Sequence, residues 1–162
     1  MLVTTALLVY VAALAAAAVS DLVSYQIPNT ICLVLVAGFA LAAPALPLGA
    51  ILSHLACGVA LLAATAICFG FRLMGGGDAK LIAATALWLG WGHVGPFILL
   101  TAIAGGVLGL LLIIVRRFAP APGDPARWYA PLLARGEGVP YGIAIAAAGL
   151  GLLAQVGPAL LQ

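Results

Sequence analysis

Charged side chains are scarce in this sequence. Asp, Glu, Lys and Arg make up 6% of the 162 residues, whereas 66% are hydrophobic, and the mean hydropathy is +1.30. Because so few polar residues cannot cover the surface of a soluble domain, lipid is expected to surround most of the chain. The formal net charge of +2 is too small to indicate a nucleic-acid partner.

Paired metal-binding cysteines are also lacking. Cys32, Cys57 and Cys68 stand apart, each within an apolar run, and the sequence has no CxxC pair. Zinc sites use closely spaced Cys and His residues, so a zinc site is not expected. We interpret the three thiols as buried and inert, and we expect no metal and no cofactor.

The apolar runs are long and continuous, as in "VLGLLLIIV" at 107–115. A membrane β-barrel would instead alternate apolar and polar residues, so the pattern predicts an all-α polytopic membrane protein. A transmembrane helix needs roughly 20 residues. About six such helices are expected, at 2–20, 27–43, 48–71, 78–91, 95–115 and 139–160. They form a single membrane-embedded domain over 1–162, with a polar loop at 116–138.

The basic residues give an independent test of this topology. If the N-terminus lies outside, every Lys and Arg falls on the inner side, namely Arg72, Lys80, Arg116, Arg117, Arg127 and Arg135. Basic residues favour the cytoplasmic side, so both termini are expected outside and the 116–138 loop inside. No Lys or Arg precedes the first apolar run, so we expect a retained span rather than a cleaved signal peptide.

Two of the four acidic residues stand out by their position. Asp21 follows the first predicted span and Asp78 opens the fourth, so both are expected at the cytoplasmic membrane edge. They can meet if the first and fourth helices pack together. Ionisable groups at membrane depth are costly and are candidates for function. The structural alternatives are that Asp78 only caps its helix and that Asp21 only ends a span in water.

Two carboxylates at one depth indicate a particular chemistry. A pair about 3 Å apart shares one proton, so one group can act as base on a water and the other as acid. This is aspartic peptide hydrolysis, which needs no metal, nucleophilic side chain or cofactor. Asp78 at a helix N-terminus favours the carboxylate and Asp21 at a helix C-terminus favours the acid. Asp78 is therefore our hypothesis for the resting base.

The residues around Asp78 have expected roles as well. Gly75, Gly76 and Gly77 permit a substrate backbone to approach closely, so they are predicted to form a flexible wall of the site. Lys80 lies two residues beyond Asp78 and therefore faces another side of the helix. We expect its ammonium group to reach lipid phosphates.

Three segments resemble known sequence blocks. "GGGD" at 75–78 resembles the GxGD signature of intramembrane-type aspartic proteases. "SDLVSYQIPN", "MGGGDAKLIAA" and "VPYGIAIAAAG" resemble, in order, the two catalytic segments and the last-helix segment of type IV prepilin peptidases. The resemblance covers nearly the whole chain.

This resemblance implies a function and a set of site residues. Such peptidases remove the leader from prepilins or pseudopilins at the cytoplasmic face of the bacterial inner membrane. Asp21 and Asp78 would be the catalytic pair. The resemblance places further residues near the site, namely Gly75, Gly76, Gly77, Pro28, Asn29, Lys80, Pro140, Tyr141 and Gly142.

The sequence also departs from the larger members of that family. Those carry a cytoplasmic insertion between the first two helices, often with two CxxC pairs, and they also N-methylate the product. Residues 21–27 leave no room for an insertion. The chain therefore resembles the compact group linked to tight-adherence (Flp) pili, and methyltransferase activity is not expected. Two other classes stay open: a small transporter or proton-conducting module, and a non-catalytic subunit of a secretion or pilus assembly system.

Overall fold

A computed structural model describes residues 2–118, 129, 132 and 138–157, and these residues are helical apart from short connections. The elements in chain order are α1 (Leu2–Ser24), α2 (Asn29–Ala42), the short 3-10 helix η1 (Ala43–Ala45), α3 (Leu48–Gly70), α4 (Gly76–Phe118) and α6 (Tyr141–Val156). The predicted all-α class is confirmed. Of these helices, α1, α3 and α4 are long and apolar enough to cross a membrane, and two shorter helices are also apolar.

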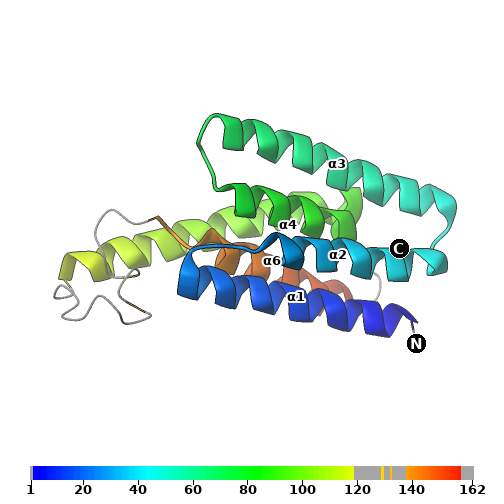
Figure 1. The fold of residues 1–162 in the computed structure, drawn as a ribbon, viewed down its shortest axis with the longest axis horizontal. Helices are drawn as coiled ribbons and strands as arrows, with labels where there is room; N and C mark the ends of the chain where they lie inside the picture. Colours follow the sequence, from blue (N-terminus) through cyan, green and yellow to red (C-terminus); the bar gives the residue numbers. More distant parts are fainter. Residues whose placement is uncertain (1, 119–128, 130–131, 133–137, 158–162) are drawn as a thin grey trace.

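The helix α4 is two helical segments joined at a break. At Gly90 the backbone has φ 62° and ψ −176°, in a region that residues with a Cβ rarely adopt. The second segment returns alongside the first (Figure 1). Near its end, Arg116 Nη2 lies 3.3 Å from the hydroxyl of Tyr25, just beyond α1. The predicted fourth and fifth spans are therefore present, as the two halves of α4.

A histidine from α3 stabilises this break. His54 is buried, and its Nδ1 donates a hydrogen bond to the Leu87 carbonyl at 2.9 Å. A Cβ added to Gly90 would lie 3.0 Å from the His54 ring. In an unbroken helix this carbonyl would bond to the N–H four residues later, which lies beyond Gly90. His54 is thus a side-chain cap for the first half of α4.

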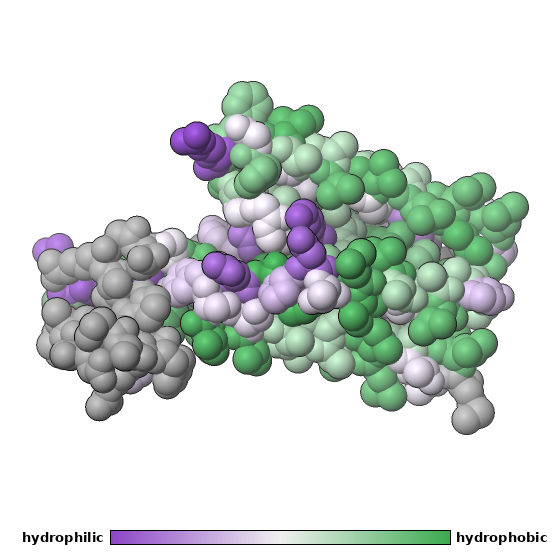
Figure 2. Space-filling view, in the orientation of Figure 1, coloured by the Kyte–Doolittle hydropathy of each residue, from purple (hydrophilic) through white to green (hydrophobic). Residues whose placement is uncertain are grey.

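The first half of α4 forms the centre of the bundle. It is packed by α3, α6 and α2, while α1 packs on α2 and α6 (Figure 1). Trp88 is fully buried, where its ring lies 5.0 Å from that of Tyr10 and its Nε1 donates to the Leu35 carbonyl at 2.9 Å. Many large apolar side chains on the other helices are exposed instead, and green residues dominate the surface away from the end that carries the polar groups (Figure 2). This distribution matches a bundle that is surrounded by lipid.

The end of α1 differs from the prediction. The helix continues past Ser20 to Ser24, so Asp21 lies inside its last turn and does not follow it. The Tyr25 N–H bonds to the Asp21 carbonyl at 2.9 Å, and Tyr25 then turns the chain with φ 54°. Polar residues were taken to end the span, but the backbone hydrogen bonds continue for another turn.

The predicted polar loop lies largely outside the described residues. The helix α4 extends into it as far as Phe118. Most of the remainder of 116–138, including Asp124, Arg127, Arg135 and Glu137, is not described.

Candidate active site

The structure brings Asp21 and Asp78 to the same end of the bundle. Asp21 is 5% exposed on the last turn of α1, and Asp78 is half-buried on the first turn of α4. The two carboxylates are close enough for their charges to interact. Ile27 contacts the residues next to both aspartates. A Cβ added to Gly77 would lie 3.1 Å from the Ile27 Cβ, and a Cβ added to Gly142 would lie 3.0 Å from the Ile27 Cδ1.

Helix α6 mediates this approach. The helices α1 and α4 both pack extensively on α6, whereas they are not among the helix pairs in extensive contact with each other. The first and fourth helices do touch, through the rings of Tyr10 and Trp88, but both pack more extensively on α6. At the aspartate end, the start of α6 lies against Asp21 through Gly142 and against the second half of α4 through Tyr141 and Gly105.

The Asp21 carboxylate accepts a hydrogen bond from α6. The Gly142 N–H donates to Asp21 Oδ2 at 2.6 Å. Gly142 is the second residue of α6, where the N–H has no partner within the helix and the helix dipole attracts negative charge. Asp21 thus lies in the last turn of α1 and also faces the start of α6. The sequence argument did not include the contact with α6. The helix-dipole argument no longer distinguishes Asp21 from Asp78 as the resting base.

Asp78 lies in the first turn of α4, close to the backbone of Gly75. Gly75 is the residue before the helix, and its carbonyl accepts the first helical bond from the Ala79 N–H at 3.1 Å. Asp78, three residues after Gly75, accepts a hydrogen bond from the Gly75 N–H with its carboxylate. Asp78 is thus the third residue of α4 and not its N-cap, which differs from the alternative considered in the sequence analysis.

The three glycines before Asp78 lie close to the site. A Cβ on Gly75 would lie 2.9 Å from Asp78 Oδ2, and one on Gly76 would lie 3.2 Å from the Phe69 ring. Gly75 is exposed, and Gly76 and Gly77 are half-buried. Within this segment, Gly75 therefore lies next to the Asp78 carboxylate and is accessible from outside.

Lys80 and Asn29 form a polar pair beside the carboxylates. Lys80 Nζ donates to Asn29 Oδ1 at 2.9 Å, which joins α4 to the start of α2. Lys80 is exposed, and the contact with lipid phosphates that the sequence predicts stays a prediction beside this hydrogen bond. Pro28 is exposed and immediately precedes α2, which begins at Asn29.

The segment before α6 is held by two features of the second half of α4. Pro140 is buried, and Tyr141, which is 41% exposed, covers Gly105 so closely that a Cβ there would overlap its ring. A Cβ on Gly109 would lie 3.6 Å from Val139. Gly105 and Gly109, four positions apart on α4, therefore let the start of α6 pack closely, and the start of α6 places Gly142 beside Asp21.

Arg116 is a functional candidate that the sequence reasoning missed. Its Nη2 donates to the Gly138 carbonyl at 2.9 Å and to the Tyr25 hydroxyl at 3.3 Å, and its Nε donates to the Leu132 carbonyl at 2.8 Å. It therefore connects the end of α1 to the segment that leads into α6. In the sequence it was one of six basic residues, and only the contacts distinguish it.

The described residues contain no group of three or more His, Cys, Asp and Glu side chains that could hold a metal ion. The nearness of Asp21 and Asp78 supports the chemistry of a carboxylate pair. Both carboxylates accept backbone N–H groups, which orient them. Of the three glycines, Gly75 is exposed beside Asp78, whereas Gly76 and Gly77 are helical and half-buried.

Comparisons with known proteins point to one family. The model of the type IV leader peptidase family matches residues 8–110, which include both aspartates. A prepilin leader peptidase/N-methyltransferase of Aeromonas salmonicida strain A449 is 39% identical over 66 residues, covering 36% of this chain and 23% of that protein. A second protein of that name from Aeromonas salmonicida matches equally. The chain thus spans about a quarter of the length of these curated relatives. No solved structure matches.

Proposed function

This chain belongs to the type IV leader peptidase family, and we propose that it is a GxGD-type aspartic endopeptidase of the membrane that removes the leader from prepilins or pseudopilins. The observation that carries this proposal is the approach of Asp21 and Asp78, 57 positions apart in the numbering (78 − 21), at one end of the helical bundle. The supporting resemblance is to relatives whose names state the same activity.

The mechanism follows from two carboxylates that share one proton. The ionised carboxylate takes a proton from a water, whose oxygen attacks the carbonyl carbon of the scissile bond, while the protonated carboxyl donates its proton to the carbonyl oxygen. Collapse of this intermediate breaks the C–N bond, and the leaving amine takes up the proton held by the base. The N–H groups of Gly142 and Gly75 hold Asp21 and Asp78 in position. Positioning of this kind contributes to the rate because the reacting groups are already aligned.

The orientation that we propose places this site at the cytoplasmic face of the bacterial inner membrane. Arg72 follows α3, Lys80 lies near the start of α4, and Arg116 contacts the end of α1, so these basic residues lie at the end that holds the aspartates. Purple residues gather on this part of the surface (Figure 2). The positive-inside rule then gives a cytoplasmic site with both termini outside.

The substrate type that we propose is a Flp-like prepilin, and we propose peptidase activity without methylation. The connection between α1 and α2 consists of residues 25–28. A connection of this length has no room for an inserted domain of the kind that larger members carry.

The test is cleavage of a co-expressed prepilin in membranes. Asp21→Asn and Asp78→Asn should each abolish cleavage, because either substitution leaves the pair without its acid–base couple. Asp124→Asn is the matched control. Asp124 lies in the polar stretch of the sequence, so this variant should cleave the prepilin at the wild-type rate. Normal processing by both site variants would refute the enzyme proposal. It would favour a non-catalytic assembly subunit, which tolerates loss of both carboxylates.

A further inference from the structure

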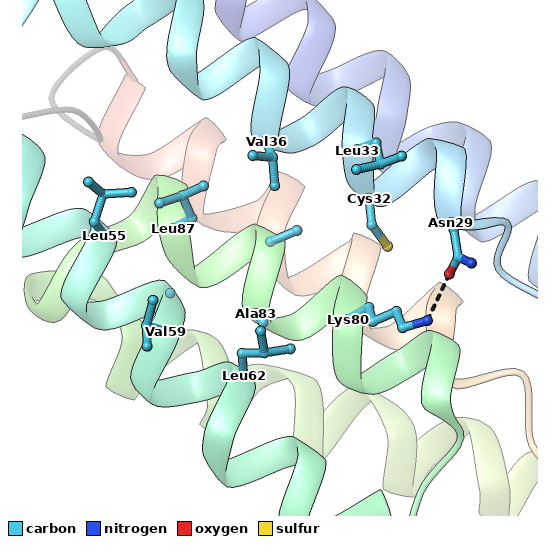
Figure 3. Close-up of a pocket in the computed structure, with 12 residues that line it drawn as sticks. Asn29, Cys32, Leu33, Val36, Leu55, Val59, Leu62, Lys80, Ala83 and Leu87 are labelled. Carbon is cyan, nitrogen blue, oxygen red and sulfur yellow. Dashed lines mark hydrogen bonds between the residues drawn. The ribbon is translucent and has the colours of Figure 1, made fainter.

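A groove runs along the first half of α4, between α2 and α3. Both helices pack on α4, yet they are not among the helix pairs in extensive contact with each other. The space between them has a volume of about 540 Å³. Figure 3 shows the side chains that line it from the three helices: Asn29, Cys32, Leu33 and Val36 of α2, Leu55, Gly58, Val59 and Leu62 of α3, and Lys80, Ala83, Ala84 and Leu87 of α4.

The groove is apolar except at one end. Its walls include exposed side chains, such as Leu33 at 64% and Val59 at 65%, and its floor is made of the small residues Ala83 and Ala84. The hydrogen-bonded pair Lys80–Asn29 lies at the polar end (Figure 3). Small residues in a floor of this kind allow another helix backbone to approach closely in a membrane.

The polar end of the groove lies beside the carboxylate pair. Lys80 is two residues from Asp78 on the same helix, and it points into the groove while Asp78 faces the surroundings of Asp21. A chain that leaves the groove at Lys80 must pass around part of an α-helix about 10 Å wide to reach Asp78. At about 3.3 Å per extended residue, this takes about three residues. The exposed Gly75 borders that route.

The charge of Lys80 is not balanced within the described residues. Its ammonium group bonds to the neutral Asn29 amide, and no carboxylate of the described residues lies within ion-pair distance of it. A cation at the end of an apolar groove in a membrane complements a carboxylate, because charges in lipid are usually paired. A helix that enters the groove with its N-terminus at Lys80 also favours an acidic residue in its first turn.

We propose that this groove binds the apolar helix of the substrate, on the C-terminal side of the cleaved bond, and that Lys80 pairs with an acidic side chain in the first two turns of that helix. This inference rests on the peptidase function proposed above. An occupant that crosses lipid must satisfy its backbone hydrogen bonds internally, which a helix does. The groove thus sets the register of cleavage, because the acidic residue is held at a set distance from Asp78.

Cys32 allows the groove to be tested with a native thiol. The chain is prepared as Cys57→Ala and Cys68→Ala with Asp78→Asn, so that Cys32 is the remaining thiol and the probe stays intact. The probe is a synthetic prepilin-like peptide with a basic leader and an apolar helix that carries one cysteine at successive positions. Cross-links to Cys32 should recur every three to four residues. A control chain carries Cys32→Ser and Leu52→Cys, which moves the thiol from α2 to a position on α3 outside the groove lining, and it should give no such pattern.

Kinetics of the catalytically intact chain give the second measurement. Val59→Trp narrows the groove and should raise KM about tenfold with kcat changed by less than about twofold, a loss of uniform binding. Leu52→Trp, on the same helix and 56% exposed, should leave both unchanged. Lys80→Gln should raise KM for a probe with Glu in the first two turns of its helix by at least about fivefold more than for the Gln version of that probe.

The outcomes separate this proposal from the peptidase proposal. A probe that cross-links periodically but is never cleaved by the intact chain refutes the peptidase function and leaves the docking groove standing. Cleavage without periodic cross-links, and with an unchanged KM in Val59→Trp, refutes the groove. Release of a co-purified phospholipid by Val59→Trp under those conditions would show that an acyl chain occupies it instead.

Discussion

The contact between α6 and Asp21 gives the sharpest prediction for this site, through the variant Gly142→Ala. A Cβ at this position would lie 2.9 Å from both Cβ and Oδ2 of Asp21 and 3.0 Å from Cδ1 of Ile27. Real Cβ atoms almost never come this close, and Asp21 Cβ is fixed to the α1 backbone. The added methyl group must therefore push α6 and the carboxylate apart and break the 2.6 Å hydrogen bond.

The size of the effect follows from that hydrogen bond. A bond to a charged group contributes about 1.5–3 kcal/mol. If this energy orients the base or acid in the transition state, its loss lowers kcat by about 10- to 150-fold. The KM for substrate should change little, because Gly142 does not line the groove between α2 and α3.

A matched control lies on the same helix. A Cβ on Gly151 would meet no atom within 4 Å. Gly151→Ala therefore gains the same helix propensity of up to about 1 kcal/mol without a clash, and it should cleave as wild type. Both variants are compared by initial rates of prepilin cleavage in detergent and by thermal unfolding. Wild-type kcat in Gly142→Ala, with the protein folded, would refute the role of this contact.

Two further substitutions test other contacts. Arg116→Gln removes charged donors from the segment before α6 and should lower kcat by about tenfold, whereas the neighbouring Arg117→Gln should not. The kcat and KM of both variants are measured. Rescue of cleavage by Arg116→Lys would favour charge alone over the multiple hydrogen bonds of the guanidinium group. His54→Ala leaves the Leu87 carbonyl unpaired at the break in α4 and should lower the free energy of unfolding by about 1–3 kcal/mol. His54→Asn should lower it less, because the Asn amide can donate from a similar position. Equal stability of the wild type and both variants in a denaturant titration would rule out the cap.

Local signals in the sequence were enough for the helices and for the choice of Asp21 and Asp78 as candidates. The fourth span was predicted to begin at Asp78, two residues after the observed start of α4 at Gly76, and counting spans placed both aspartates at one end. The end of α1 was less accurate, because Asp21 and Ser24 are polar residues that continue a helix in the structure. A polar residue lowers hydropathy without breaking backbone hydrogen bonds, so hydropathy alone ends a span too early.

The partners of the candidate residues could not be read in the same way. The link from Gly142 to Asp21 spans 121 positions, and that from Arg116 to Tyr25 spans 91. Neither leaves a periodic pattern in the sequence. The role of His54 likewise depends on where α3 meets the break at Gly90.

The amino-acid sequence by itself determined that this chain is a bundle of membrane helices with two acidic residues at one end. The reason is that lipid leaves few ways to satisfy a polypeptide backbone, so composition alone restricts the architecture. The tertiary structure decided which groups those acids contact, and it placed the start of α6 against Asp21 and the second half of α4. It also opened the groove beside Lys80, because the space between two helices depends on how both pack on a third.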